Sequence, residues 1–232
     1  MVRVIAFDGD DTLWHSEVGF VEVQEAFRAM CAPYLGPDEV DDELYKTEAA
    51  NMAAFGYGVK AFTLSMVEAA VRISGGAIPA SQIAEIVEAG KTLLNRPVEL
   101  CDGAAEAVAE LSASHRLMLL TKGDLLHQER KIAASALADH FDRVEIVSEK
   151  DAKTYRRVMR EEGVGSGELL MVGNSLRSDV LPALEAGAHA VHVPSQHTWI
   201  HEQVPGGGRD DIVVLDSLKA LPSHVWALAG AQ

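Results

Sequence analysis

The chain opens with Val2-Arg3-Val4-Ile5-Ala6-Phe7-Asp8-Gly9-Asp10-Asp11-Thr12-Leu13-Trp14, an apolar run that ends in three acids within four positions. Short apolar runs rich in β-branched residues are typical of buried strands, so we expect a strand that delivers carboxylates at its C-terminal end. Open parallel sheets bind their ligands at that edge. Gly9 lets the backbone turn, which allows Asp8 and Asp10 to converge on one point. The stretch therefore predicts a functional site at the edge of a sheet.

The three acids have several possible uses. They could form a simple turn after the strand, because Asp and Gly are common turn residues. A calcium loop of the EF-hand type is excluded, because Thr12, Leu13 and Gly19 stand at positions where that loop needs other residues. Carboxylate oxygens suit Mg²⁺, and two converging carboxylates repel each other unless a cation lies between them or one holds a proton. An Asp beside Mg²⁺ can also act as a nucleophile.

The composition is that of a globular protein with an excess of acids. Of the 232 residues, 48% are hydrophobic and 24% are charged, and the formal net charge is −15. This charge argues against nucleic acid and anionic membranes as partners. Cys31 and Cys101 have no metal-binding spacing and are expected to be reduced thiols. No secretory signal precedes the first strand and no apolar run approaches membrane-spanning length, so we expect a cytoplasmic location.

A long helical segment is expected after the first strand. An apolar stripe recurs there at steps of three and four residues, at Phe20, Val23, Phe27, Met30 and Tyr34. Three further helices are expected near residues 37–56, 59–73 and 81–96. Residues 15–97 are therefore predicted to form an all-α four-helix domain, inserted between residues 1–14 and residues 98–232 of an α/β domain.

From about residue 98 strands and helices alternate, which is typical of βαβ units and a parallel sheet. The expected strands are 116–120, 144–147, 169–173, 190–193 and 212–215. The expected helices are 103–112, 126–137, 154–162, one that ends at 186, and 217–229. Gly206-Gly207-Gly208 is expected to be a flexible surface loop.

Polar groups stand at the ends of four expected strands, where a parallel sheet would gather them: Asp8 with Asp10, Thr121, Lys150, and Asn174 with Asp179. These residue types fit phosphoryl transfer, which needs positioning and charge stabilisation more than covalent chemistry. Asp8 would attack phosphorus, and Asp10 would protonate the leaving oxygen and later deprotonate water. Thr121 and nearby backbone N–H groups would hold phosphoryl oxygens, and Lys150 would offset their charge. Asn174 and Asp179 would hold a metal ion.

Each of these residues also has a purely structural interpretation. Thr121 could cap a helix, and Asp179 could simply favour a helix N-terminus. Lys150 could be a solvated surface residue, with Lys153 as a rival for its role. Asp11 is expected to be a turn or cap residue. The joint order of the groups along the chain favours a site, although no single residue does.

That order resembles the phosphatases of the haloacid dehalogenase superfamily. Residues Asp8-Gly9-Asp10-Asp11-Thr12 are similar to the family's first motif, usually Asp-x-Asp-Gly-Thr, and Leu120-Thr121 and Lys150 to the second and third. Residues Gly173-Asn174-Ser175-x-x-x-Asp179 are similar to the fourth, usually Gly-Asp-Ser-x-x-x-Asp. The resemblance implies a three-layer Rossmann-like core with a parallel sheet of strand order 5-4-1-2-3. It also implies that the helical insert is a cap that closes over the substrate.

The resemblance implies roles for particular residues. It assigns catalysis to Asp8, Asp10, Thr121 and Lys150, phosphate binding to Thr121, Lys122, Gly123 and Lys150, and Mg²⁺ to Asp8, Asp10, Asn174 and Asp179. The sequence departs from the family pattern at two positions. Asp11 replaces a Gly, a change that many relatives tolerate. Asn174 replaces an acid, so the metal site loses one negative charge, although the amide oxygen can still coordinate.

We therefore expect a Mg²⁺-dependent phosphatase, a monomer or homodimer, that hydrolyses a small phosphorylated metabolite through an aspartyl-phosphate on Asp8. The acid at Asp10 favours an oxygen leaving group, because a departing halide needs no proton. A sugar phosphomutase of the same superfamily is the nearest alternative, since the same two aspartates serve both reactions. Alternatives of other classes are a phospho-receiver module, which is shorter and is phosphorylated after its third strand, and an inactive binding protein, which the intact motifs disfavour.

Overall fold

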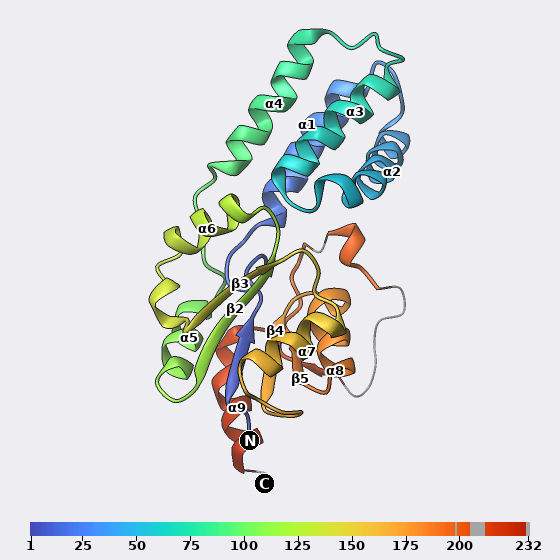
Figure 1. Cartoon of the computed structure of the whole chain (residues 1–232). Coiled ribbons are helices and arrows are strands. Elements are labelled where there is room, and N and C mark those ends of the chain that lie inside the picture. Colours follow the sequence, from blue (N-terminus) through green and yellow to red (C-terminus); the bar gives the residue numbers. More distant parts are fainter. Residues whose placement is uncertain (198, 205–211, 231–232) are drawn as a thin grey trace. The chain divides into compact units, whose positions relative to one another are not determined.

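The computed structural model describes residues 1–197, 199–204 and 212–230, and in these residues the central element is a parallel sheet of six strands (Figure 1). The strands are β1 (Val4–Phe7), β2 (Arg116–Lys122), β3 (Arg143–Val147), β4 (Leu169–Gly173), β5 (His189–His192) and β6 (Val213–Val214). They lie in the order β3-β2-β1-β4-β5-β6. The predicted order 5-4-1-2-3 is therefore confirmed for the first five strands, and β6 extends the sheet beside β5.

The chain divides into two compact units. Unit 1 comprises Met1–Glu17, Val98–Lys122 and Gln128–Gln232 and contains the sheet, whereas unit 2 comprises Val18–Pro97 and Gly123–His127 and is helical. The short segment 123–127 groups with unit 2 although it follows β2 directly. An ion pair joins this segment to another part of unit 2, since Lys60 Nζ donates to Asp124 Oδ2 at 2.9 Å.

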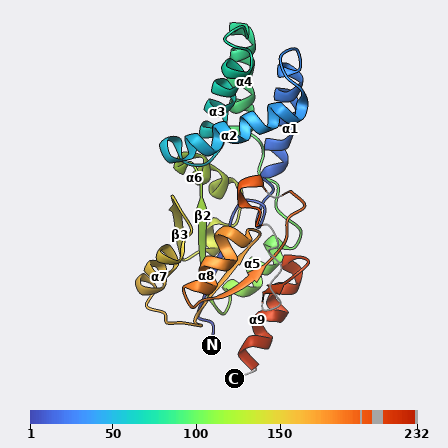
Figure 2. The same cartoon turned by 90° about the vertical axis from the view of Figure 1, so that its right-hand side faces the viewer.

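The sheet of unit 1 is covered by helices on both faces. Successive side chains of β1 alternate between the two faces, so that Ala6 packs into one apolar cluster and Phe7 into the other. The helices that contribute to the Phe7 cluster include α5 (Ala104–Ser112) and α9 (Leu221–Gly230), and those that contribute to the Ala6 cluster are α7 (Ala152–Glu161) and α8 (Leu181–Glu185). Figure 2 shows α7 and α9 on opposite sides of the strands. Unit 1 is thus the predicted three-layer α/β core.

Unit 2, whose residues are all described, has four helices around an apolar interior. They are α1 (Glu17–Cys31), α2 (Pro37–Phe55), α3 (Val59–Ile73) and α4 (Ala80–Leu94). Phe27 lies at the centre of the predicted stripe on α1 and packs in one cluster with Leu44 of α2 and Phe62 of α3. The stripe is shorter than predicted, because α1 ends at Cys31 and Tyr34 lies beyond it.

Some helix boundaries in unit 1 differ from the expected ones. Helix α6 spans Leu125–Ala134 and ends before residue 137, because Ala136 adopts a φ of +58°, which an α-helix cannot continue. A π-helical turn at Leu176–Val180 precedes α8, and a 3₁₀ turn at Leu218–Ala220 precedes α9. The predicted loop at Gly206-Gly207-Gly208 lies outside the described residues. None of the helices in the described part of the chain combines the length and apolar character needed to cross a bilayer.

Candidate active site

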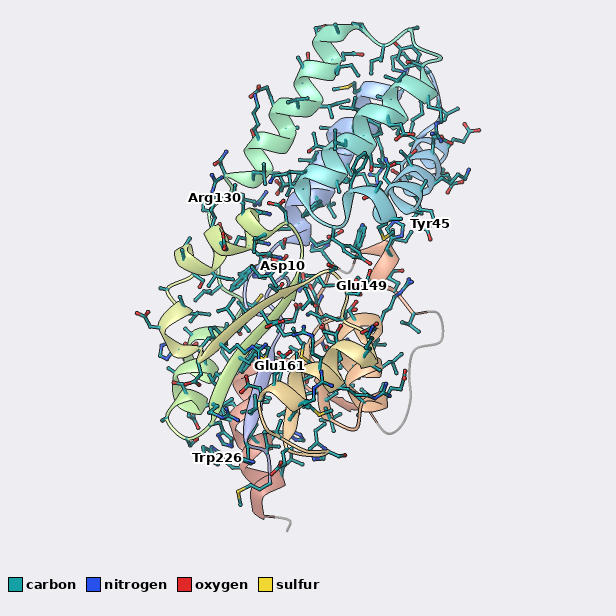
Figure 3. All side chains as sticks on the ribbon, viewed as in Figure 1. Asp10, Tyr45, Arg130, Glu149, Glu161 and Trp226 are labelled. Carbon is teal, nitrogen blue, oxygen red and sulfur yellow. The ribbon has the colours of Figure 1, made fainter. Side chains whose placement is uncertain are left out.

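Polar side chains gather at the carboxyl edge of the sheet in unit 1. In the strand register Asp8, the residue after β1, lies beside the ends of β2, which carries Thr121, and of β4, which Asn174 follows. Lys150 follows β3 in the turn before α7. Figure 3 labels Asp10 near this end of the strands. The parallel topology therefore brings residues from four separate parts of the sequence to one edge.

Asp8, Lys150 and Asp179 form a buried charged cluster. Lys150 Nζ donates to Asp8 Oδ1 at 2.5 Å and to Asp179 Oδ1 at 2.7 Å. The side chain of Asp8 is 10% exposed, that of Lys150 is 2% exposed and that of Asp179 is 0% exposed. Burial opposes the charge of the ammonium, but attraction to the two carboxylates raises the pKa of Lys150 and keeps it protonated. Lys153, the other lysine that the sequence offered for this role, is exposed and is not part of this cluster.

The cluster holds more negative than positive charge, since one ammonium faces two carboxylates. Burial raises the pKa of Asp8 to about 7; attraction to Lys150 opposes this rise and repulsion from Asp179 adds to it. A further cation at this place would favour the ionised form of Asp8, because an opposite charge nearby stabilises a carboxylate. The electrostatics of the cluster are thus those of a site that can accept a cation.

The oxygen atoms beside Asp8 suit a hard cation. Thr12 Oγ1 lies 3.4 Å from Asp8 Oδ2 and 3.3 Å from Asn174 Oδ1, and its single proton can bond only one of them at a time. Among the described residues no group of three or more His, Cys, Asp or Glu side chains could hold a metal ion. A metal ion here could draw on the amide oxygen of Asn174 beside the carboxylates of Asp8 and Asp179. Such an all-oxygen set fits Mg²⁺, which also takes waters and substrate oxygens.

Asp10 and Asp8 bind different lysines. Trp14 Nε1 donates to Asp10 Oδ1 at 2.7 Å, and Lys131 Nζ donates to the same oxygen. Gln128 Nε2 donates to Asp10 Oδ2 at 2.9 Å. Burial opposes ionisation, but the charge of Lys131 and these hydrogen bonds lower the pKa of Asp10. A separate ammonium for each acid reduces the repulsion that convergence would cause.

Asp11 holds the turn that follows the acids. It adopts a φ of +58°, and its carboxylate accepts hydrogen bonds from the backbone N–H groups of Ser16 at 3.0 Å and Glu17 at 2.9 Å. These N–H groups stand at the start of α1, where a helix lacks internal partners. Burial raises the pKa of Asp11 to about 6. Its contacts are those of a turn and cap residue.

The second motif lies within β2 rather than at the start of a helix. Thr121 is 1% exposed and its hydroxyl oxygen lies 3.3 Å from the donor Gln128 Nε2, so it does not cap α6. Lys122 Nζ donates to Glu202 Oε1 at 2.5 Å. Gly123, with a φ of +134°, belongs to the segment that groups with unit 2. Thr121 and Lys122 are therefore the predicted phosphate contacts of this motif that belong to unit 1.

Three polar residues around the site were missed in the sequence: Gln128, Lys131 and Glu202. Glu202 accepts hydrogen bonds from Ser178 Oγ at 2.5 Å and from Ser175 Oγ, which ties a later loop to the fourth motif. The sequence could have indicated Gln128 and Lys131, because they are polar, stand three positions apart and so share one face of the helix that follows the second motif. Glu202 had none, because its contacts are tertiary and its loop has no periodic pattern.

Comparisons with known proteins agree on one family. A family model described as haloacid dehalogenase-like hydrolase matches residues 2–187. The chain is 32% identical to human (Homo sapiens) N-acylneuraminate-9-phosphatase over 140 residues, which cover 58% of this chain and 54% of that protein. It is 33% identical to the mouse (Mus musculus) enzyme over 108 residues, which cover 44% of this chain and 41% of that protein. The chain thus spans about half the length of these curated relatives.

A solved structure matches over almost the whole chain. The crystal structure of a haloacid dehalogenase-like family hydrolase from Xanthomonas campestris superposes with a TM-score of 0.89 at 39% sequence identity. The match covers 99% of this chain and 93% of that one. Both the sheet of unit 1 and the helices of unit 2 are therefore shared with this hydrolase.

Proposed function

Because the chain belongs to the haloacid dehalogenase-like hydrolase family, we propose that it is a phosphatase that releases phosphate from a small phosphorylated metabolite. The observation that carries the proposal is the pair of acids in the first motif, each with its own lysine. Asp8 lies in the buried cluster with Lys150, as a nucleophile would. Asp10 is a second acid beside it, and a reaction that expels an oxygen needs one to supply a proton. The names of the curated relatives agree with this reaction class.

The proposed reaction has two steps. First a carboxylate oxygen of Asp8 attacks phosphorus, and the bond from phosphorus to the ester oxygen breaks. The electron pair of that bond stays on the leaving oxygen, which takes the proton carried by the neutral form of Asp10, and Asp10 becomes ionised. Then water attacks the phosphorus of the aspartyl-phosphate, Asp10 takes a proton from that water, and phosphate departs from Asp8. Lys150 and Thr121 stabilise the negative phosphoryl oxygens in both steps.

We assign Mg²⁺ to the oxygen atoms of Asp8, Asn174 and Asp179. Asp10, which the sequence also placed among the metal ligands, has a carboxylate that already accepts from three donors. We therefore assign Asp10 to proton transfer alone. When bound, Mg²⁺ would supply positive charge that offsets the phosphoryl group and the buried carboxylates. The raised pKa of Asp8 supports this assignment, because an uncompensated buried carboxylate gains most from a cation.

The helices of residues 15–97 are proposed to form the cap domain that selects the substrate, with residues 1–14 and 98–232 as the catalytic core. The proposed catalytic residues all belong to unit 1, so unit 2 is left to discriminate between substrates. Since the curated relatives are named for an N-acylneuraminate 9-phosphate, that compound comes first among the candidates. The chain spans only about half of those relatives, so the proposal remains the broader class of phosphorylated metabolites.

The proposal is tested by phosphate release from a panel of phosphorylated metabolites with Mg²⁺ present. The wild-type protein should release phosphate, EDTA should stop the release, and added Mg²⁺ should restore it. Asp8→Asn should lower turnover by at least about 10⁴-fold, because an amide is a poor nucleophile. The matched control is Asp139→Asn, an exposed acid on a 3₁₀ turn of the same unit, which should retain activity. Full turnover by Asp8→Asn would refute the role of Asp8, and conversion of sugar phosphates without phosphate release would indicate a mutase.

A further inference from the structure

Helix α6 carries a buried lysine that the reaction as described does not use. Gln128 and Lys131 are 2% and 8% exposed, although both are polar and one is charged. They stand three residues apart on one helix face. Lysines are rarely this buried unless their charge is paired, and the ammonium of Lys131 is paired with Asp10. The helix thus directs two polar side chains at the same carboxylate.

The contacts of Gln128 join that carboxylate to the end of β2. Gln128 Nε2 lies 2.9 Å from Asp10 Oδ2, 3.3 Å from Thr121 Oγ1 and 2.5 Å from the backbone oxygen of Lys122. One amide group therefore faces both the acid of the first motif and the hydroxyl of the second. Because Lys131 and Trp14 bond the other oxygen of Asp10, both carboxylate oxygens are fixed.

We infer that Lys131, together with Gln128, is a positioning residue for proton transfer by Asp10, an inference that rests on the proposed phosphatase function. Among the described residues the ammonium of Lys131 bonds only the carboxylate of Asp10, so it acts through that residue and not on the phosphoryl group. Lys150 serves Asp8 in the same way at the buried cluster. The two acids of the first motif are therefore set for different tasks by different lysines.

The leaving group of the substrate separates this role from a merely structural one. An alkyl phosphate expels a poor leaving group and needs the proton from Asp10, whereas an aryl phosphate with an acidic phenol needs it little. Lys131→Met leaves the carboxyl group of Asp10 without the contact that orients it, so kcat should fall by about tenfold or more on an alkyl phosphate and much less on the aryl phosphate, even though the loss of the ammonium also removes a charge that lowers the pKa of Asp10. KM should stay within about twofold, because the phosphate contacts are unchanged. Lys131→Arg should recover most of the loss, since it keeps the charge.

A double-mutant cycle tests whether Lys131 acts through Asp10. In an Asp10→Asn background, Lys131→Met should cause no further loss of kcat, because the group that it positions is already absent. The matched control is Lys153→Met, which replaces an exposed lysine and should leave kcat unchanged on both substrates. Equal loss on both esters, or a further loss in the Asp10→Asn background, would overturn the inference.

A signal that does not depend on activity reports on the same contact. Trp14 Nε1–H donates to the oxygen of Asp10 that Lys131 also bonds, so its indole resonance in a ¹H–¹⁵N spectrum should shift in Lys131→Met. The indole resonance of Trp226, which Figure 3 places at the other end of unit 1 from Asp10, should stay in place. If the wild-type protein hydrolyses neither ester, the proposed function fails by itself. An unmoved Trp14 resonance would overturn the inference in either case.

Discussion

The two units differ in what they bury. Among its described residues, unit 1 buries four carboxylate or ammonium side chains, each between 0% and 8% exposed: Asp8, Lys131, Lys150 and Asp179. In unit 2, which is described throughout, the buried polar side chains are the uncharged Thr47 and Ser65. A buried charge is costly unless it is paired, so a fold that only needed stability would follow the pattern of unit 2. We therefore infer that the residue types at these four positions of unit 1 serve a chemical role rather than the packing of the core.

This contrast leads to different expectations for mutations in each unit. In unit 1, removal of a buried charge should lower both stability and turnover, because the remaining charges lose their partner. In unit 2, removal of a buried apolar group should lower the stability of the helices that contact it. Charges on the surface of either unit should matter least, since water screens them.

The largest effect is expected for Lys150→Met, which leaves Asp8 and Asp179 buried without the ammonium between them. Breaking a buried ion pair costs about 3–5 kcal/mol, and turnover should fall by at least about 10²-fold. Urea unfolding and phosphate release measure the two losses. Because burial already raises the pKa of Asp8 to about 7, protonation at lower pH removes one of the two unpaired charges. The loss of stability should therefore be smaller at about pH 5 than at about pH 8.

The control for this prediction is Lys153→Met, three positions further on. Lys153 is exposed, so its substitution should change neither the urea midpoint nor turnover. If Lys150→Met behaved like Lys153→Met, the buried cluster would contribute nothing, and the contrast between the two units would lose its main support.

The order of the motifs predicted contacts between distant residues but not the partner of every acid. Lys150 lies 142 positions after Asp8 and still bonds to it, because each stands at the end of a strand and parallel strands share one carboxyl edge. The pairing of Asp10 with Lys131 was not predicted, because it depends on how α6 turns against the sheet. The local pattern of apolar residues predicts strands and helix faces. Which of two nearby lysines pairs with a given acid depends on the tertiary packing of the helices against the sheet.

An intermediate effect is expected for Phe27→Ala in unit 2. Phe27 is 2% exposed in the apolar interior of the four helices, and truncation of a buried Phe costs about 3–5 kcal/mol. The chain's three tryptophans, Trp14, Trp199 and Trp226, all belong to unit 1, so their fluorescence follows that unit alone. Far-UV circular dichroism also follows the helices of unit 2. We expect the dichroism transition to move to lower urea while the fluorescence transition stays in place.

The control for Phe27→Ala is Val87→Ala on α4, where the side chain is 37% exposed and should tolerate truncation. An equal shift of both transitions in Phe27→Ala would show that the two units unfold as one. The contrast drawn between the units would then apply to their chemistry and not to their stability.

The smallest effect is expected for Arg72→Gln on the surface of unit 2. Arg72 donates to Glu43 at 3.1 Å and to Glu68 at 2.6 Å, and the distance to Glu68 is as short as those around Lys150, but the Arg72 side chain is 53% exposed. Water solvates the partners of an exposed charge when it is removed, so the stability loss should be about 0.5 kcal/mol or less and should shrink further in high salt. Urea unfolding followed by circular dichroism at low and high salt measures both. A loss as large as that of Lys150→Met would mean that short distance, and not burial, sets the strength of ion pairs in this protein.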